Sequence, residues 1–135
     1  MAKDDLQHYD HDAAGCWTDL VVSILSVNNR SVERTYELVA GLEKNGLVSP
    51  SNLAELDAAE ICRRLKSAGY DRGEFMTNLF AIRLVGLGAF ISKQGMDAAT
   101  QVILSRDRRT IEKTLAGVYG IGPAVIRNFC ALRGI

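Results

Sequence analysis

Helix start and stop signals recur along this chain at intervals of roughly ten to twenty residues, and they limit what it can fold into. Asp57 with Glu60, and Asp71 with Glu74, each form the capping-box pattern that opens a helix. Further start and stop signals are Ser31, Asn45-Gly46, Gly69, Lys93-Gln-Gly95 and Asp107. No segment alternates convincingly between polar and apolar residues as a strand does. The sequence therefore predicts an all-α fold, a single compact domain of about seven helices joined by short loops.

Apolar residues recur at helical spacing between these signals. The segment 17–27 is apolar nearly all round, which predicts a central helix packed on several sides. It runs into a corner at Asn28 and Asn29, after which Ser31 caps the next helix. Four of the remaining predicted helices are marked by apolar residues: Val32, Tyr36, Val39 and Leu42 in the first, Ile61 and Leu65 in the second, Phe75, Leu79, Ile82, Phe90 and Ile91 in the third, and Ile111 and Leu115 in the fourth. Gly86 and Gly88 are predicted close-packing points on the third of these helices. Two more helices are predicted over residues 96–104 and 124–129. A connecting turn is predicted at Ser49-Pro50-Ser51.

The most informative stretch for function is a glycine-punctuated hairpin between the last two predicted helices. Gly120 and Gly122 bracket Ile121, so the backbone can take positive φ and approach another molecule, while Ile121 plugs the hairpin into the core. Pro123 suits the first turn of the helix that continues through Ala124. Exposed amides at the positive end of a helix dipole bind a phosphate oxygen and read no base sequence. The hairpin therefore predicts a grip on a nucleic-acid backbone, although short glycine-rich turns also occur between helices that merely pack together.

Charge is uneven although the net charge of the chain is zero and its pI is near 6.7. Residues 1–15 hold one Lys against four Asp, whereas residues 105–135 hold six basic against two acidic side chains, a net charge of about +4. The basic side chains are Arg106, Arg108, Arg109, Lys113, Arg127 and Arg133. Cations beside the hairpin, Arg127 above all, would add salt-dependent attraction to phosphates, and the alternative is that they line solvated helix faces. Asp107 and Glu112 are interpreted as capping or surface residues.

Cofactor and compartment signals are weak. Cys16, Cys62 and Cys130 are widely spaced, without the pattern of a zinc or iron–sulfur site, and are expected to be buried thiols in a reducing compartment. A polar tail, residues 1–14, contains His8-Tyr-Asp-His-Asp12, a metal-like cluster that we attribute to a charged terminus. The tail is unlike a signal peptide, and no segment reaches the ~18 uncharged apolar residues of a membrane span, so a cytoplasmic location with no membrane partner is expected.

Three segments together resemble the endonuclease III-like base-excision DNA glycosylases of the helix-hairpin-helix superfamily: Trp17 to Ser31, Ile61 to Tyr70, and Leu115 to Phe129. The order and spacing match over residues ~16–132, and the resemblance implies one helical DNA-binding domain over residues 15–135. It implies a core helix that ends in a corner with a polar residue probing the DNA near a flipped base, and Asn28, with Asn29 beside it, falls there on the minor-groove side. The hairpin alone also resembles that of DNA polymerase beta. Hairpins of that kind hold a potassium or sodium ion on carbonyls that correspond to Ala116, Val118 and Ile121.

The resemblance also implies catalytic groups that are not recognisable here. Bifunctional relatives carry a nucleophilic Lys two residues after the second hairpin glycine, where this chain has Ala124. Their catalytic Asp follows the second hairpin helix, beyond the last residue of this sequence, and the four-cysteine iron–sulfur loop of many relatives is also missing. The expected function is therefore DNA binding, with duplex DNA, damaged or abasic, as the partner and a second chain or a second copy covering the truncated face. The alternatives are an active glycosylase completed by a partner or another carboxylate, and a helical protein-interaction module.

Overall fold

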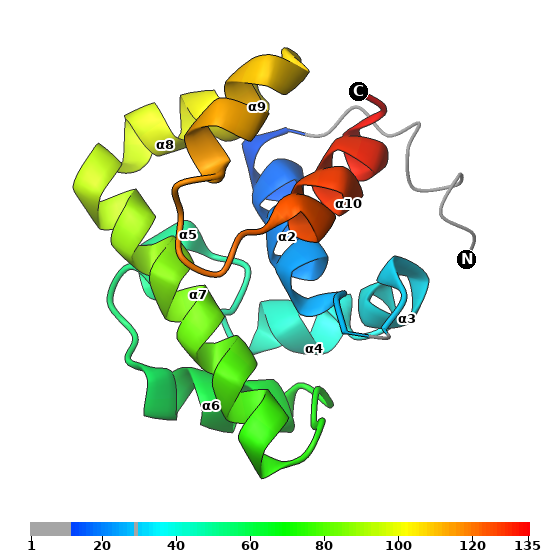
Figure 1. Ribbon diagram of the computed structural model, residues 1–135. Helices are drawn as coiled ribbons and strands as arrows, with labels where there is room; N and C mark the ends of the chain where they lie inside the picture. The colour runs from blue at the N-terminus through cyan, green and yellow to red at the C-terminus, as the bar shows by residue number, and fades with distance from the viewer. Residues whose placement is uncertain (1–11, 29) are drawn as a thin grey trace.

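The computed structural model describes residues 12–28 and 30–135, and within them it contains nine helices and no strand (Figure 1). The all-α prediction is confirmed. The helices are α2 (Ala13–Leu25), α3 (Val32–Tyr36), α4 (Val39–Lys44), α5 (Pro50–Leu53), α6 (Ala58–Ser67), α7 (Glu74–Gln94), α8 (Met96–Leu104), α9 (Arg108–Leu115) and α10 (Pro123–Arg133). The first begins inside the predicted tail, where the Asp12 carboxylate caps α2 by accepting from the Gly15 N–H.

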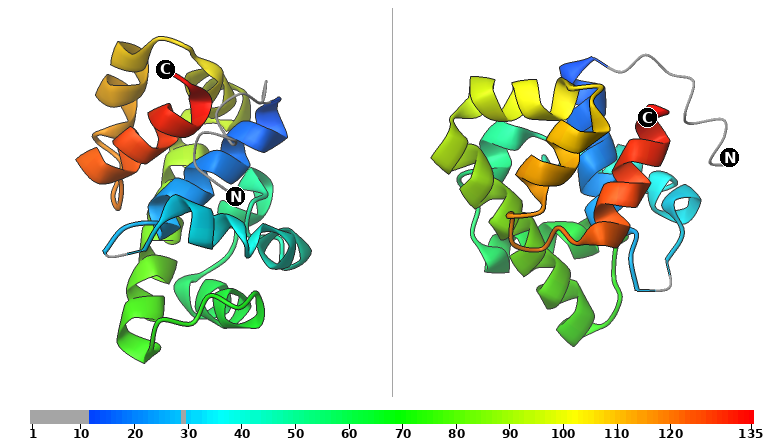
Figure 2. Two further views of the ribbon diagram at one scale, coloured as in Figure 1. Left: turned by 90° about the vertical axis from the view of Figure 1, so that its right-hand side faces the viewer. Right: turned by 45° about the horizontal axis from the view of Figure 1, so that its top comes forward.

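Helix α2 is the central element, as its sequence predicts. It contacts α3, α7, α8 and α10, and its apolar residues Trp17, Leu20 and Ile24 are almost wholly buried. Because it is covered on several sides, it can be apolar nearly all round. Figure 2 shows α10 lying alongside α2, with α7 crossing on another side. The element that follows the hairpin is therefore packed on the element that precedes the Asn28 corner.

Helix α7 makes the closest backbone approaches in the described residues. A Cβ on Gly88 would lie 2.0 Å from the Leu53 carbonyl oxygen of α5, and one on Gly86 would lie 2.4 Å from the Tyr119 carbonyl oxygen of the hairpin. Only a hydrogen atom fits at these points, which confirms their prediction as close-packing glycines. The hairpin is consequently seated on the backbone of α7, and Figures 1 and 2 show the turn between α9 and α10 passing over this helix.

Helix α7 is also long and apolar enough to cross a membrane by length and composition, contrary to the sequence expectation. Its most apolar window has a mean hydropathy of 1.6, and 44% of that window is buried. Contacts with α2, α5, α6 and α8 provide another reason for the apolar composition, because a core helix passes the same test.

The second predicted helix is broken into α3 and α4, which, together with the short α5, accounts for nine helices where about seven were expected. Val32 packs against Val22 and Leu132 in a small satellite cluster, while Leu42 lies in the main core. Tyr36 of α3 and Val39 of α4 also pack against the satellite cluster, so α4 leads from it into the main core. The Ser49-Pro50-Ser51 turn is likewise the capped start of α5.

The start of α7 differs from the predicted capping box. Its N-cap is Gly73, at φ +86°, and Asp71 accepts instead from the Gly73 N–H at 3.0 Å. The helix therefore begins beyond the box, with no side-chain cap. Two residues predicted for its apolar face, Phe75 and Ile82, are exposed at 79% and 36%.

At the start of α6, the predicted Asp57 cap is confirmed. Glu60 of the same predicted box pairs instead with Arg63 and Arg64, which lowers the pKa of Glu60 to about 2.

Candidate nucleic-acid interface

The last two helices form a helix-hairpin-helix, with residues 116–122 between α9 and α10. Hydrogen bonds from the Val118 N–H to the Leu115 carbonyl and from the Ile121 N–H to the Val118 carbonyl, at 3.0 and 3.1 Å, close the turn. Ile121 is only 5% exposed, so the prediction that it plugs the hairpin into the core is confirmed. Gly120 has φ +88°, a conformation that suits glycine, and a Cβ there would lie 2.8 Å from that of Arg83. The tip is thereby fixed in shape.

Gly122 differs from its prediction in backbone conformation but not in openness. Its φ is −104°, an ordinary extended value, so the expected positive φ is wrong at this position. It is the N-cap of α10, it supplies no side-chain cap, and a Cβ there would meet nothing within 4 Å. Pro123 occupies the first turn as predicted, leaving the N–H groups of Ala124 and Val125 without a capping side chain. This helix start is accessible to an outside acceptor.

A groove with a volume of about 470 Å³ brings the hairpin and the Asn28 corner together. We call it the hairpin groove, and it is lined by Val27, Asn28, Leu79, Arg83, Tyr119, Gly120, Ile121, Gly122, Pro123, Ala124 and Val125. Asn28 is exposed and has φ +59°, the one positive value outside glycine in the described residues. Asn29 lies outside the described residues. No acidic side chain lines the hairpin groove, which suits an anionic ligand.

Three arginines stack on two aromatic rings, and one of them, Arg83, lines the hairpin groove; the sequence analysis did not single them out. Tyr70 and Phe80 meet edge to face with centroids 5.8 Å apart. The guanidinium carbons of Arg72 and Arg83 lie 5.1 and 4.8 Å from the Phe80 centroid, and that of Arg30 lies 5.0 Å from the Tyr70 centroid. One signal was available, since Arg83 is the lone charged residue between positions 75 and 92 of a helix that is otherwise apolar or uncharged. Stacking orients the three guanidinium groups, of which that of Arg83 belongs to the groove lining.

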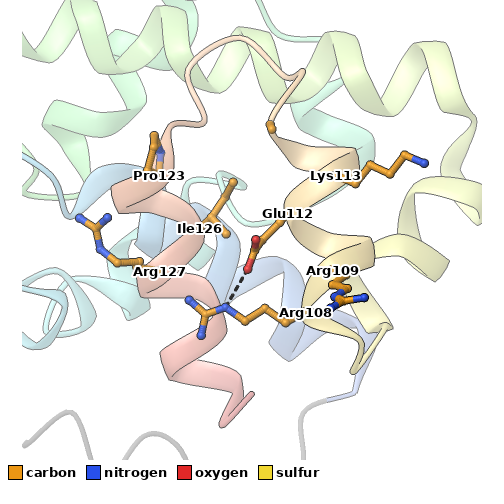
Figure 3. Close-up of a pocket in the computed structure, with 8 residues that line it drawn as sticks. Arg108, Arg109, Glu112, Lys113, Pro123, Ile126 and Arg127 are labelled. Carbon is orange, nitrogen blue, oxygen red and sulfur yellow. Dashed lines mark hydrogen bonds and ion pairs between the residues drawn. The ribbon is translucent and has the colours of Figure 1, made fainter.

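A second groove lies between α9 and α10 and shares Pro123 with the first (Figure 3). Glu112 and Ile126 point toward each other across it. Arg108 lies one turn before Glu112 on α9 and forms an ion pair with it at 2.9 Å. Lys113 and Arg127 point away from its centre on opposite sides. Its middle is therefore apolar and charge-balanced, with cations on the flanks. The hairpin groove has no acidic side chain and includes the start of α10, which makes it the candidate anion site.

The predicted basic residues of the C-terminal segment separate into two groups. Five are exposed: Arg106, Arg108, Arg109, Lys113 and Arg127. Arg133 is only 6% exposed, and its guanidinium donates to the Ile103, Leu104 and Ser105 carbonyls at the end of α8. Arg133 is therefore a buried helix cap. It is neither a cation free to attract phosphate nor part of a solvated helix face, the two interpretations drawn from the sequence, because buried guanidinium groups need several acceptors.

Carboxylates and thiols of the described residues form no reactive cluster. Asp107 caps α9 and Glu112 pairs with Arg108, as expected. No three metal-ligating side chains gather within the described residues, and the His8–His11 part of the tail lies outside them. Cys16 and Cys130 are buried, which raises the pKa of each thiol, whereas Cys62 is half-buried, so its predicted burial is wrong. The site thus consists of backbone amides, an asparagine corner and cations.

No protein-family model matches this chain, and no curated protein or solved structure matches it either. The resemblance to the glycosylases therefore stays a prediction that rests on the three sequence segments.

Proposed function

We propose that this protein binds the phosphate backbone of duplex DNA through the hairpin groove, as a domain of base-excision repair type. The observation that carries the proposal is the start of α10, where the N–H groups of Ala124 and Val125 have no side-chain cap and both residues line a groove without acidic side chains. A phosphate oxygen is the acceptor that such a helix start favours, because the helix dipole and the amides act together.

The shape of the hairpin supports a backbone ligand over a small molecule. Gly122 presents no side chain, so another chain can approach the main chain closely. Arg83 lines the same groove, and exposed Arg127 lies one turn along α10 from Pro123. These cations would add Coulomb attraction that weakens with salt, which is the mark of phosphate binding.

A monovalent cation at the hairpin belongs to this proposal. The carbonyl oxygens of Ala116, Val118 and Ile121 are hard donors of the kind that replace the hydration shell of K⁺ or Na⁺. The Val118 oxygen accepts one hydrogen bond, from the Ile121 N–H, and retains a second lone pair. A bound cation would place further positive charge beside the phosphate.

Across the groove, Asn28 would face the minor-groove side of a duplex gripped in this way. An abasic site is a favourable target, because a duplex without a base at one position bends and opens at lower cost. Base excision itself needs a positioned carboxylate or amine, and the groove lining offers neither: Ala124 stands where bifunctional relatives carry a Lys. We therefore propose binding and not catalysis for the residues at hand.

The deciding experiment is a fluorescence-anisotropy titration of the protein against an abasic duplex and an intact duplex of the same sequence, each at several salt concentrations. The expected result is salt-sensitive binding that is tighter for the abasic duplex. Arg127→Ala should lower the slope of log K against log salt by about one if this residue touches a phosphate. No binding at low salt would refute the proposal and favour a helical protein-interaction module.

A further inference from the structure

Four successive backbone carbonyls at the end of α2 each accept a hydrogen bond from a side chain distant in sequence. Leu25 accepts from the Tyr70 hydroxyl at 2.8 Å, and Ser26 accepts from the Asn128 side-chain amide at 3.2 Å. Val27 accepts from one Arg72 guanidinium nitrogen at 2.9 Å, and the Asn28 carbonyl accepts from the other. Carbonyls at a helix end are normally left to water or to one cap. This clamp, formed by Tyr70, Arg72 and Asn128, therefore fixes the whole corner.

The clamp holds a residue whose backbone conformation is unfavourable by itself. Asn28 has φ +59°, in the left-handed region, which is unfavourable for L-residues in general and which Asn tolerates better than most. Such residues persist where the surroundings over-determine them, and they cluster at binding sites. Here the strained residue is exposed and lies in the hairpin groove opposite Gly120–Val125.

Arg72 is itself held in place by contacts on three sides. Its guanidinium stacks on Phe80, its main-chain N–H donates to the Thr77 hydroxyl at 2.9 Å, and its side chain also lies 3.4 Å from the Tyr70 hydroxyl. Burial raises the pKa of Tyr70, so this hydroxyl keeps the proton that it donates to Leu25. A planar guanidinium suits a pair of adjacent carbonyls, because its N–H donors are fixed in a fork.

Asn128 connects the corner to the hairpin, because it lies on α10, the helix whose first turn contains the open amides. The position of the corner relative to the amides is thus fixed by one hydrogen bond between α10 and Ser26, while the Arg72 fork holds Val27 and Asn28. Neither Arg72 nor Asn128 lines the hairpin groove, so neither is placed to touch DNA there.

We propose that Arg72 and Asn128 are positioning residues that fix the Asn28 corner opposite the phosphate-binding amides, and that this fixed geometry makes the protein prefer abasic over intact duplex. The proposal rests on the proposed function, since it concerns the same groove. The grip on phosphate comes from the hairpin and the cations. The preference for abasic duplex comes from the rigid corner, because an intact and stiffer duplex cannot be accommodated by moving this corner.

The test compares the ratio of intact to abasic dissociation constants, and the salt slope, for wild type, Asn128→Ala, Arg72→Lys and Arg72→Ala. Asn128→Ala should reduce the ratio several-fold and Arg72→Ala by about tenfold, the value of one hydrogen bond to a charged donor, with the salt slope unchanged. Arg72→Lys should recover part of the ratio, because it keeps the charge and a donor but not the fork.

Asn52→Ala is the matched control. It removes a side-chain amide bond to a backbone carbonyl, Gly46, of the same 3.2 Å length, away from the groove, and should leave the ratio unchanged. Thermal melts establish that each variant is folded, and Asn128→Ala and Arg72→Lys carry the test if Arg72→Ala unfolds. If Asn128→Ala and Arg72→Lys both keep the wild-type ratio of dissociation constants, the positioning role is overturned while the DNA grip stands. A wild type that binds both duplexes equally would overturn it as well. Salt-insensitive or absent binding by the wild type would instead remove the proposed function itself.

Discussion

Gly122→Asp should make the protein more stable and a worse DNA binder, and the two effects have the same structural origin. Gly122 is the N-cap of α10, with extended backbone at φ −104° and ψ −175° and open space where a Cβ would go. Asp is among the best N-cap residues, since its carboxylate accepts from the N–H groups of the first turn. A carboxylate at the positive end of the helix dipole is worth about 0.3–1 kcal/mol, or roughly 1–4 °C in melting temperature.

The same carboxylate should abolish most of the binding. It would occupy the amides proposed for the phosphate, and at about 5 Å from that phosphate the repulsion is ~3 kcal/mol at an effective dielectric constant of about 20. The expected loss is roughly a hundredfold or more in affinity, equal for all duplex sequences because the contact is to the backbone. Differential scanning calorimetry measures the first effect, and anisotropy titrations on several duplexes measure the second.

Two further variants separate charge from capping. Gly122→Ser supplies a neutral cap and should cost about tenfold in binding by competing for the amides. Gly117→Asp carries the same charge on the same turn, where a Cβ also meets nothing, but it caps no helix and should have the smaller effect. A well-folded Gly122→Asp protein that binds duplex as tightly as wild type would show that α10 does not hold the phosphate. A loss that depends on base sequence would contradict the backbone contact.

The remaining predictions concern packing, capping and thiol access. Gly88→Ala should destabilise the fold by about 2 kcal/mol in urea unfolding, since overpacking against the Leu53 backbone exceeds the ~1 kcal/mol gained in helix propensity, and Gly117→Ala, whose Cβ meets nothing, should not. Arg133→Met should lower the free energy of unfolding by about 2–4 kcal/mol, because the Ile103, Leu104 and Ser105 carbonyls lose their donor. Replacing the exposed Arg127 by Ala should lower it by less than about 0.5 kcal/mol. Equal losses would contradict the capping role. A thiol reagent should modify Cys62 alone in the native protein and all three cysteines after unfolding. Burial raises the pKa of Cys16 and Cys130 and blocks access to them. Rapid modification of either in the native protein would show that α2 or α10 opens readily.

Local signals in the sequence located most of the helices, because caps and glycine stops act on neighbouring residues. Met96–Leu104 matches its predicted range, and Ser31, Asp57 and Asp107 cap the helices they were expected to cap. The errors arose where distant packing decides the outcome. The segment from α3 to α4 spans a satellite cluster and the main core, and the exposure of Phe75 depends on which side of α7 the neighbouring helices cover.

The candidate site divides in the same way. The hairpin was recognisable because Gly120, Ile121, Gly122 and Pro123 determine its conformation locally. Arg72 was not, because its partners lie 44 and 45 residues away along the chain and no periodic pattern marks it. Arg133 shows the converse, since a basic residue near a presumed binding surface turned out to be buried against α8.

The seat of the hairpin on Gly86 has a consequence for the thermodynamics of binding. The Tyr119 carbonyl rests against a helix backbone with no side chain between them to bend or change rotamer, so the turn has no room to shift toward α7. The conformational entropy of the hairpin is therefore lost during folding and not during association. A duplex would meet a surface that is already ordered, and the heat-capacity change on binding should reflect only the area that the two molecules cover.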